Sequence, residues 1–291
     1  MVIKTDRIPA HGETVLGGEF AMFPGGKGAN QAVAAARLGA AVSFVARVGT
    51  DVFGDKAVEG FRREGIDTEF VVRDPEEPSG IALIFVDRRG ENVIAVAPGA
   101  NSRLSPADVE RASERLSGCS ALVLQLEIPL ETVERAARLA SEHGVRVILN
   151  PAPMMPDGLP RPLLELVDVL VPNETEARTL LDLGECGRID EGAMSRLPEI
   201  GVRTAVVTLG ARGALVVTRD GVQAVSAPRV RAVDTTAAGD AFVGALVVAL
   251  SSGHDLLESA RFAGRAAALS VTRMGAQSSL PTAQEVAQLD D

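Results

Sequence analysis

The sequence contains no tryptophan and no tyrosine, and its 291 residues include only two cysteines and three histidines. Cys119 and Cys186 are too few for the disulfide framework of a small secreted protein, and no cysteine or histidine has zinc-binding spacing. These shortages favour a reducing compartment. The missing large aromatics imply a core of small aliphatic side chains, which suits helices on a parallel sheet, although codon bias explains this composition equally well.

Long runs of apolar or basic residues are also missing. No stretch of about 18 apolar residues would span a bilayer, and residues 1–13 lack the apolar segment of a signal peptide. A net charge of −10 without any basic run argues against a nucleic-acid partner. We therefore predict a cytoplasmic protein that binds neither membrane nor nucleic acid. Its length suits one large domain with a small appendage.

Helix-like and strand-like segments alternate from about residue 104 onward. Three segments have the apolar spacing of helices: 104–116, 129–144 and 174–184. Four short apolar runs are typical of strands: 121–127, 145–150, 167–173 and 203–210. Such alternation predicts right-handed crossovers and a mostly parallel sheet with helices on both faces. The predicted fold class is α/β, with three α/β/α layers.

The region from residue 13 to residue 100 does not follow this alternation. TVLGGEFAMF, SGIALIFVD and ENVIAVAPG are strand-like, and the turn DRRGEN predicts a hairpin between the last two. We expect strands at about 13–24 and 80–98 to form a small β-sheet lid, with a helix from about Ala29 to Leu38 between them. In the alternative they extend the main sheet. In either case we interpret residues 1–291 as a single catalytic domain.

The segment from Asp234 to Phe242, DTTAAGDAF, follows a strand-like stretch and opens an apolar helix. Small residues at a helix start let backbone N–H groups approach an anion, and the helix dipole adds positive potential there. We therefore expect an anion hole. Asp240, in the first turn, would accept a proton from a substrate hydroxyl during phosphoryl transfer. Aspartate is equally a common helix cap, and the local sequence does not separate the two roles.

A second glycine-rich segment, FPGGKGAN at 23–30, precedes an alanine-rich helix. It fails as a nucleotide P-loop, because G-x-x-x-x-G-K-[ST] requires serine or threonine where Gly28 follows Lys27. Glycines beside Lys27 and Asn30 suit instead a loop that hydrogen-bonds a polyol. The alternative is a glycine-rich turn with an exposed lysine.

In PNETEA, Asn173 and Glu176 follow a strand and open a helix, three residues apart on one face. This pair would hold the waters around Mg²⁺, which prefers few direct protein ligands. Taken alone, the pattern is more often a helix N-cap with its glutamate partner.

Two longer motifs, GGKGANQAVAAARLGA and DTTAAGDAF, stand about 210 residues apart with QLE, PNETEA and TLGARG between them. In this order they resemble the two signatures of the ribokinase/fructokinase superfamily of sugar kinases, and the similarity extends from about Ile8 to Pro281. The resemblance implies a ribokinase-like fold and ATP-dependent phosphorylation of a small sugar. D-ribose, giving D-ribose 5-phosphate, is the predicted substrate, and fructose, deoxyribose and nucleosides are the alternatives.

The resemblance also implies roles for the matching residues. Asp240 would be the catalytic base beside an anion hole formed by Ala237, Ala238 and Gly239. The residues implied to bind the sugar are Gly26, Lys27, Asn30, Glu127 and Asp240. Those implied to bind ATP are Asn173, Thr208, Gly210, Gly213 and Gly239. Mg²⁺ would be organised through water by Asn173 and Glu176. An activating cation of the potassium type would be held by Asp234, Thr236 and groups near Arg273, Gly275 and Ser279.

Members of the superfamily carry a strand and a G-x-x-N-x-D stretch ahead of the residues that match Met1. That strand lies in the main sheet and its aspartate binds the sugar, so we expect weaker binding and folding of the 291-residue form. The alternative function is then a sugar-binding protein with impaired catalysis. The resemblance further implies a homodimer joined through the lid, whose apolar side chains and open strand edges a partner would cover. A monomer whose lid closes on its own site is the alternative.

Overall fold

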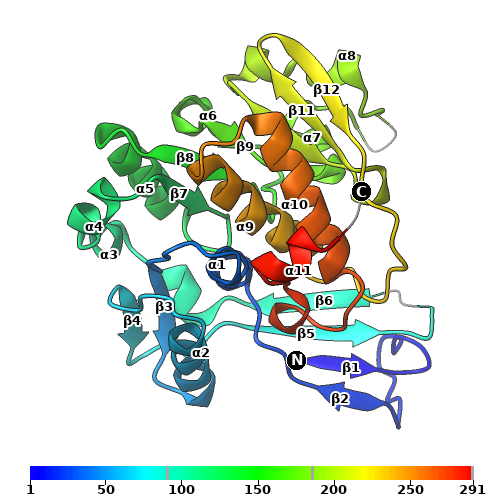
Figure 1. Cartoon of the computed structure of the whole chain (residues 1–291). Helices are drawn as coiled ribbons and strands as arrows, with labels where there is room; N and C mark the ends of the chain where they lie inside the picture. The colour runs from blue at the N-terminus through cyan, green and yellow to red at the C-terminus, as the bar shows by residue number, and fades with distance from the viewer. Residues whose placement is uncertain (90–91, 185–186, 290–291) are drawn as a thin grey trace.

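The computed structural model describes residues 1–89, 92–184 and 187–289, and its centre is a six-stranded sheet (Figure 1). In spatial order the strands are β12 (Gly221–Val225), β11 (Ala214–Thr218), β10 (Ala205–Thr208), β9 (Val169–Leu170), β8 (Arg146–Leu149) and β7 (Ala121–Leu124). Strands β7 to β10 run parallel, and β11 and β12 add an antiparallel edge. The sheet is mostly parallel, as the sequence predicted.

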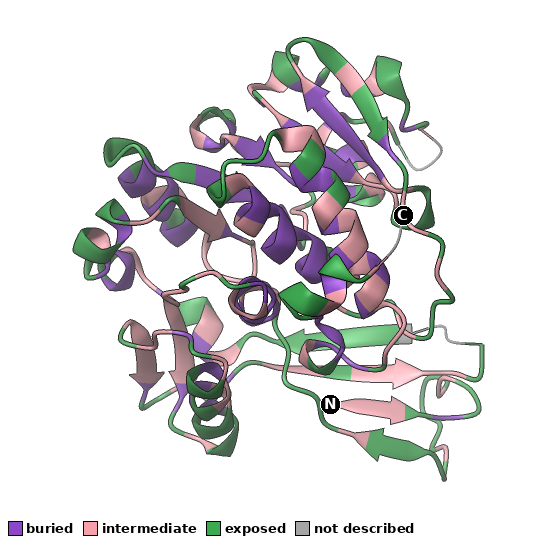
Figure 2. Ribbon diagram, viewed as in Figure 1, coloured by how far each residue is buried: buried purple, intermediate pink, exposed green. Residues whose placement is uncertain are grey.

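Helices cover both faces of this sheet because its strands are apolar on both sides. In β8, Val147 and Leu149 face one core and Ile148 faces the other, and all three are fully buried. Buried segments gather in the main sheet and in the helices packed against it (Figure 2). The first core is covered by α5 (Leu130–Glu142), α6 (Arg161–Leu166), α7 (Glu174–Leu180) and α8 (Glu191–Met194). The second is covered by α1 (Lys27–Arg37), α9 (Ala238–Ser251), α10 (Leu256–Ser270) and α11 (Ala283–Ala287). The predicted α/β/α layering is confirmed.

Most segments that the sequence marked as helices or strands have that structure. One differs: the predicted helix at 104–116 is two short helices, α3 (Pro106–Glu110) and α4 (Ser113–Ser117). Pro106 opens α3 behind a capping box in which the Ser105 and Asp108 side chains bond each other's backbone N–H. The chain then turns at residues 111 and 112 before α4. The apolar spacing was therefore right, but a single continuous helix was wrong.

A separate four-stranded sheet projects from the main body as the lid, in the order β2-β1-β5-β6 (Figure 1). Its strands are β1 (Val2–Lys4), β2 (Glu19–Ala21), β5 (Ile81–Val86) and β6 (Asn92–Ala97), with β5 and β6 antiparallel. Strand β1, which pairs with both β2 and β5, was not predicted from the sequence. Within the predicted range 13–24 only Glu19–Ala21 is a strand. Residues 90 and 91 of the DRRGEN turn lie outside the described residues.

Along the chain, a parallel β-α-β unit lies between the lid strands β2 and β5, after α1: β3 (Ala46–Gly49), α2 (Val52–Arg63) and β4 (Val71–Asp74). The sequence interpretation of residues 13–100, which had only lid strands and one helix there, missed this unit. Asp51 caps α2 by accepting hydrogen bonds from two N–H groups of its first turn. Phe61 of α2 packs edge-on against Phe44, with ring centroids 5.1 Å apart. This unit therefore has its own cap and apolar contacts.

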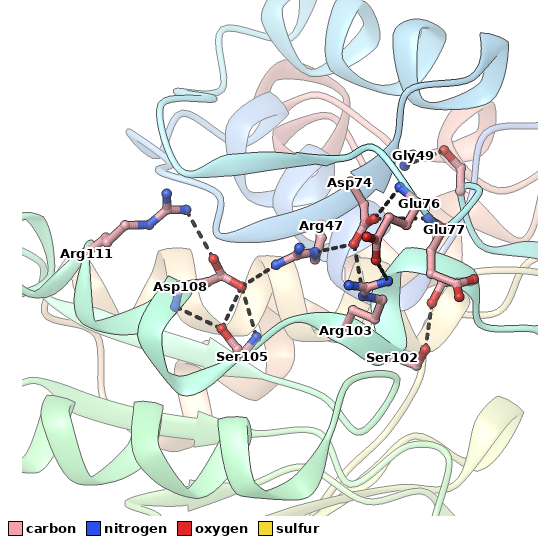
Figure 3. Close-up of polar contacts among 12 residues, drawn as sticks. Arg47, Gly49, Asp74, Glu76, Glu77, Ser102, Arg103, Ser105, Asp108 and Arg111 are labelled. Atoms are coloured by element: carbon pink, nitrogen blue, oxygen red, sulfur yellow. Dashed lines mark hydrogen bonds and ion pairs between the residues drawn. The ribbon is translucent and has the colours of Figure 1, made fainter.

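An ion-pair network joins this unit to the chain that leaves the lid (Figure 3). The Arg47 guanidinium on β3 donates to Asp74 on β4 at 2.7 Å and to Asp108 on α3 at 3.0 Å. Arg103, in the 3₁₀ helix η1 (Gly99–Arg103) directly after β6, also contacts Asp74 at 3.3 Å. Two backbone N–H groups, from Glu77 and Glu76, and the Arg47 guanidinium outweigh burial and hold the pKa of Asp74 at about 2. The base of the lid is thereby tied to β3, β4 and α3.

An open cleft of about 3540 Å³ runs between the lid, the β3–β4 pair and the main sheet. In the part of the chain that the structure describes, β3 pairs only with β4 and β7 only with β8, so one edge of each strand borders this cleft. The same described part contains no helix of the length and apolarity needed to cross a membrane.

Candidate active site

Polar side chains follow the parallel strands and gather where the carboxyl ends of these strands lie. Gln125 and Glu127 come after β7, Asn150 after β8 and Asn173 after β9, while Thr208 ends β10. In open α/β sheets, ligands bind in the crevice outside these strand ends. The chain thus gathers polar groups where the fold places its binding sites.

The N-terminus of α9 faces these strand ends, and some of its backbone N–H groups have no hydrogen-bond acceptor in the described part of the chain. Its N-cap, Ala237, has φ of 60°, a left-handed conformation that non-glycine residues seldom adopt and that clusters at functional sites. Among the described residues, the N–H groups of Gly239 and Asp240 have no hydrogen-bond acceptor. A Cβ built on Gly239 would meet no atom within 4 Å. Of the three residues predicted to form the anion hole, Ala238 is a wrong prediction, because its N–H donates to the Thr235 carbonyl oxygen at 3.3 Å. The start of α9 still presents free N–H groups to open space at Gly239, which is the geometry expected of an anion hole.

Asp240 is buried and does not cap its own helix. Its carboxylate accepts hydrogen bonds from two side chains of α1: Asn30 Nδ2 donates to Oδ2 at 2.8 Å and Gln31 Nε2 to Oδ1 at 3.0 Å. Burial raises the pKa of Asp240, against the opposing effects of Asn30, of the Lys27 charge and of Gln31. The alternative of a helix cap is therefore wrong. A buried carboxyl with a raised pKa is a common feature of functional sites.

The glycine-rich segment forms the start of α1 and faces Glu127. Gly26 is the N-cap, with φ of 95°, and the N–H of Lys27 donates to Glu127 Oε2 at 2.8 Å. Gly26 has no side chain that could cap the helix, so the Glu127 carboxylate, from a distant loop, accepts from one of the free N–H groups of the first turn. Asn30 is buried, and in the described part of the chain its Oδ1 atom has no hydrogen-bond partner. This buried acceptor is aimed at nothing in the protein, so it is available to a hydroxyl of a ligand.

Asn173 and Glu176 form a capping box, which was one of the two structures predicted for them from the sequence. Each bonds the other's backbone N–H, and Asn173 Nδ2 also donates to Glu176 Oε1 at 2.9 Å. Both residues line a pocket of about 430 Å³ together with Lys27. Burial raises the pKa of Glu176 despite the backbone hydrogen bond from Asn173. Its oxygens each accept one hydrogen bond and keep lone pairs for ordered water, so the pair fits a hydrated Mg²⁺.

Besides Asn173 and Gly239, three residues were predicted to bind ATP, and they lie at the end of β10 and in the turn that follows it. Thr208 forms a bridge with Asn173, and Gly210 opens a 3₁₀ turn that ends before Gly213. Gly213 has φ of 94°, and a Cβ there would lie 1.9 Å from the carbonyl oxygen of Val225. Only glycine fits this position. None of the three lines the 430 Å³ pocket that holds Asn173 and Glu176.

Asp234 ties the loop ahead of α9 to residues 271–275. Its Oδ1 accepts from the Thr236 N–H at 2.9 Å and hydroxyl at 2.6 Å, and its Oδ2 accepts from the Gly275 N–H at 2.8 Å. Burial works against the charged carboxylate, but the hydroxyl and the N–H groups outweigh it and keep the pKa of Asp234 below its usual range. Three residues of the predicted cation site are thus brought together.

The other two residues named for that cation have partners of their own. The Arg273 guanidinium donates to Glu285 at 2.6 Å, and the fully buried Ser279 hydroxyl donates to the Ala276 carbonyl at 2.8 Å. Across the described ranges, no three His, Cys, Asp or Glu side chains gather as a metal site. A cation here would therefore depend on backbone oxygens beside Asp234 rather than on a carboxylate cluster.

Sequence reasoning missed three amide side chains near Asp240. Gln31 contacts the carboxylate, and Gln125 and Asn150 both contact Gln31. The available signal was positional: Gln31 follows Asn30 in the first motif, and the other two directly follow β7 and β8. Because ligands of open α/β sheets bind outside the carboxyl ends of the strands, a polar residue directly after a buried parallel strand is a candidate for the site.

Comparison with known proteins agrees with this geometry. The profile of the pfkB family carbohydrate kinases matches residues 1–283. A curated ribokinase of Haemophilus influenzae is 43% identical, with 98% of this chain and 92% of the relative covered. A solved ribokinase of Thermotoga maritima superposes with a TM-score of 0.89 at 39% identity, covering 98% and 94% of the two chains. A ribokinase of Arabidopsis thaliana, solved with ribose and ATP, gives 0.88 at 32% identity, covering 99% and 94%. The resemblance predicted from the two motifs is confirmed, and the chain belongs to the pfkB family of carbohydrate kinases.

Proposed function

We propose that this protein transfers the γ-phosphoryl group of ATP to the 5-hydroxyl of D-ribose. The observation that carries the proposal is the placement of Asp240. Its carboxylate is held by Asn30 and Gln31, beside the free N–H groups at the start of α9. The ribokinase relatives, one of them solved with ribose and ATP, supply the substrate pair.

The side chains divide the chemistry between them. Asp240 takes the proton of the sugar hydroxyl as its oxygen attacks the γ-phosphorus, and the bond to the bridging oxygen breaks to leave ADP. The N–H groups of Gly239 and Asp240 face the negative charge that develops on the phosphoryl oxygens. The buried Oδ1 of Asn30 accepts from a sugar hydroxyl, and Gly26, Lys27 and Glu127 complete the sugar site.

ATP lies along the carboxyl ends of β9 and β10 in this proposal. Asn173 and Glu176 would hold the waters of a bound Mg²⁺, whose charge would neutralise the phosphates, and Lys27 lines the same pocket. Thr208, Gly210 and Gly213 border the nucleotide. The cytoplasmic location and the single-domain organisation stay predictions.

The substrate is tested by an ADP-release assay over ribose, 2-deoxyribose, fructose and adenosine. We expect the highest kcat/KM with ribose and no turnover when Mg²⁺ is removed by chelation. A higher kcat/KM for a nucleoside or for 2-deoxyribose would overturn the choice of ribose while leaving the kinase activity intact. ATP hydrolysis without any sugar product would overturn phosphoryl transfer itself.

We further propose that a potassium ion activates the enzyme by ordering the loop from Asp234 to Ala237. The Asp234 carboxylate and the adjacent backbone carbonyls offer hard oxygen ligands next to the anion hole. We expect kcat to be higher in potassium than in sodium at equal ionic strength, with little change in KM for ribose. Asp234→Ala should remove this difference. Equal rates in both salts, with Asp234→Ala harmless, would contradict the proposal.

A homodimer joined through the outer face of the lid is also part of the proposal. One apolar row crosses all four strands in register: Phe20, Ile3, Phe85 and Val93. Phe20 and Val93 are 62% and 51% exposed, whereas the cleft is lined by the other face, which carries Ile94. Exposed apolar rows and open strand edges are typical of surfaces that a partner covers.

Light scattering tests this assembly. We expect a mass of twice 30.3 kDa for the wild type and a monomer for the double variant Phe20→Asp/Val93→Asp. The matched control is Ile94→Asp, which alters the same strand as Val93 but the opposite face, and should remain dimeric. A wild-type mass near 30.3 kDa at micromolar concentration, or a double variant that still dimerises, would contradict this interface.

A further inference from the structure

We propose that Gln31 is a positioning residue for Asp240, held in a single amide orientation by Asn150 and Gln125. The three amides form a hydrogen-bonded series from the ends of β7 and β8 to the start of α9, in which Gln31 is buried and Gln125 and Asn150 are half-buried. The inference rests on the proposed function, because Gln31 has this task only if Asp240 receives the proton.

The donor and acceptor roles of these three amides are set by one backbone carbonyl group. The carbonyl oxygen of Val171 can only accept, so Asn150 must turn its NH₂ toward it, and Nδ2 donates there at 2.9 Å. Asn150 Oδ1 then faces Gln31, which must present its own NH₂, and the Nε2 to Oδ1 distance is 3.1 Å. The same Nε2 donates to Asp240 Oδ1 at 3.0 Å. Each orientation follows from the one before it.

Gln125 contacts the oxygen atom of the Gln31 amide. Its Nε2 donates to Gln31 Oε1 at 2.6 Å, so a flipped Gln31 would turn its oxygen toward both Asn150 and the carboxylate. Gln31 is only 2% exposed, so water would not compensate for such a flip. A Cβ at Gly28 would lie 2.9 Å from Gln125 Oε1, so the glycine-rich segment leaves room for this approach. The orientation of the Gln31 amide is therefore set from the Val171 carbonyl through Asn150, and Gln125 supports it by donating to the Gln31 oxygen.

The consequence for Asp240 is electrostatic. An amide NH₂ donates to the carboxylate and cannot take its proton, so Gln31 favours the charged form that a base needs. Three other charged groups act on Asp240: Lys27 favours the charged form, and Glu127 and Glu176 oppose it. Because burial raises the pKa of Asp240, the loss of a donor would raise it further. Activity would then disappear at a higher pH as the solution is acidified.

The experiment is the pH dependence of kcat for Gln31→Met, which keeps the chain length and removes both hydrogen-bonding atoms. We expect kcat to fall roughly tenfold to a hundredfold, as for one hydrogen bond to a charged group. The acid limb should move up by about one pH unit or more, while KM for ribose and ATP stays within about threefold. The matched control is Val33→Ala, which opens a hole in the same helix without touching the carboxylate. Its acid limb should stay in place.

The outcomes separate the two proposals. If Asp240→Asn stays active, the base assignment fails and this inference fails with it. If Asp240→Asn is inactive but the acid limb of Gln31→Met coincides with the wild type, only the role of Gln31 is overturned. Should Gln31→Met not fold, Gln125→Met decides, because it removes one anchor and leaves the donor. We then expect a smaller shift in the same direction, and an unchanged profile would overturn the inference.

Discussion

Asp240→Asn is expected to abolish turnover while ATP binding stays within a few-fold of the wild type. The amide keeps the shape of the carboxylate but cannot accept the hydroxyl proton, and a general base contributes about 10²–10⁴ in rate. The fold should tolerate the change. The side-chain amide of Asn30 can flip, so that its Oδ1, which has no partner among the described residues, accepts from the new NH₂. Gln31 would continue to donate to the remaining oxygen.

Single-turnover phosphorylation and ATP titration together measure this result. Asp168→Asn is the matched control, because Asp168 accepts the Val147 N–H at 2.8 Å ahead of β9, at the sheet edge opposite the site. Its amide oxygen can still accept that bond, so activity should be unchanged. An Asp240→Asn enzyme with more than about a tenth of the wild-type kcat would show that another group takes the proton.

The main sheet was accessible to sequence reasoning because its strands are continuous apolar runs. Residues 145–150 hold β8, whose three fully buried side chains face both cores, and such runs between amphipathic helices define a parallel sheet. Strand β1 was missed because three residues, VIK, carry no period that a pattern can reveal. Its place in the lid is set by pairing with β5, more than 80 residues away.

The β3–α2–β4 unit was missed for a different reason. The strands ARVG and VVRD are each interrupted by an arginine, and Arg47 looks like a solvent-exposed residue in the sequence. In the structure it is partly buried and paired with Asp74 and Asp108, the second of which lies 61 residues away. The helix had a readable signal that was not used, since Asp51 is a standard N-cap residue ahead of an amphipathic segment.

Local patterns offered Asp240, Lys27, Asn30, Asn173 and Glu176 as site residues with alternatives, and only the family motifs joined them into one site. Nothing local in either motif reveals that Asn30 donates to Asp240 across 210 residues, because such contacts depend on how α1 packs on α9. The hydrogen bonds among Gln31, Gln125 and Asn150 could not be predicted for the same reason, although the positions of these residues were a usable signal. Gln125 and Asn150 are ordinary polar residues in the sequence, and only the parallel register of β7 and β8 brings both to Gln31.

Gly244→Val is expected to lower kcat about a hundredfold, although Gly244 is not among the residues proposed to bind the sugar or ATP. It lies one turn after Asp240 on the same face of α9, where the helix meets α1. A Cβ there would lie 2.5 Å from the Cβ of Ala34 and 3.0 Å from the carbonyl oxygen of Gln31. Two Cβ atoms cannot pack 2.5 Å apart, so a side chain at position 244 must push α1 away from α9, and the side chains of α1 move with it. A displacement of about 1 Å in a catalytic group can cost about 10²-fold.

Stability distinguishes this effect from a general defect. Overpacking a core costs roughly 1–3 kcal/mol, so the unfolding midpoint of Gly244→Val should fall while the enzyme still folds. Gly264→Val is the matched control, since this glycine of α10 also lies in a helix but its Cβ would meet no atom within 4 Å. There the loss of backbone freedom in the unfolded chain favours folding, and neither kcat nor stability should drop. If Gly244→Val kept kcat within about threefold of Gly264→Val despite its lower stability, the spacing of α1 and α9 would not set the geometry at Asp240.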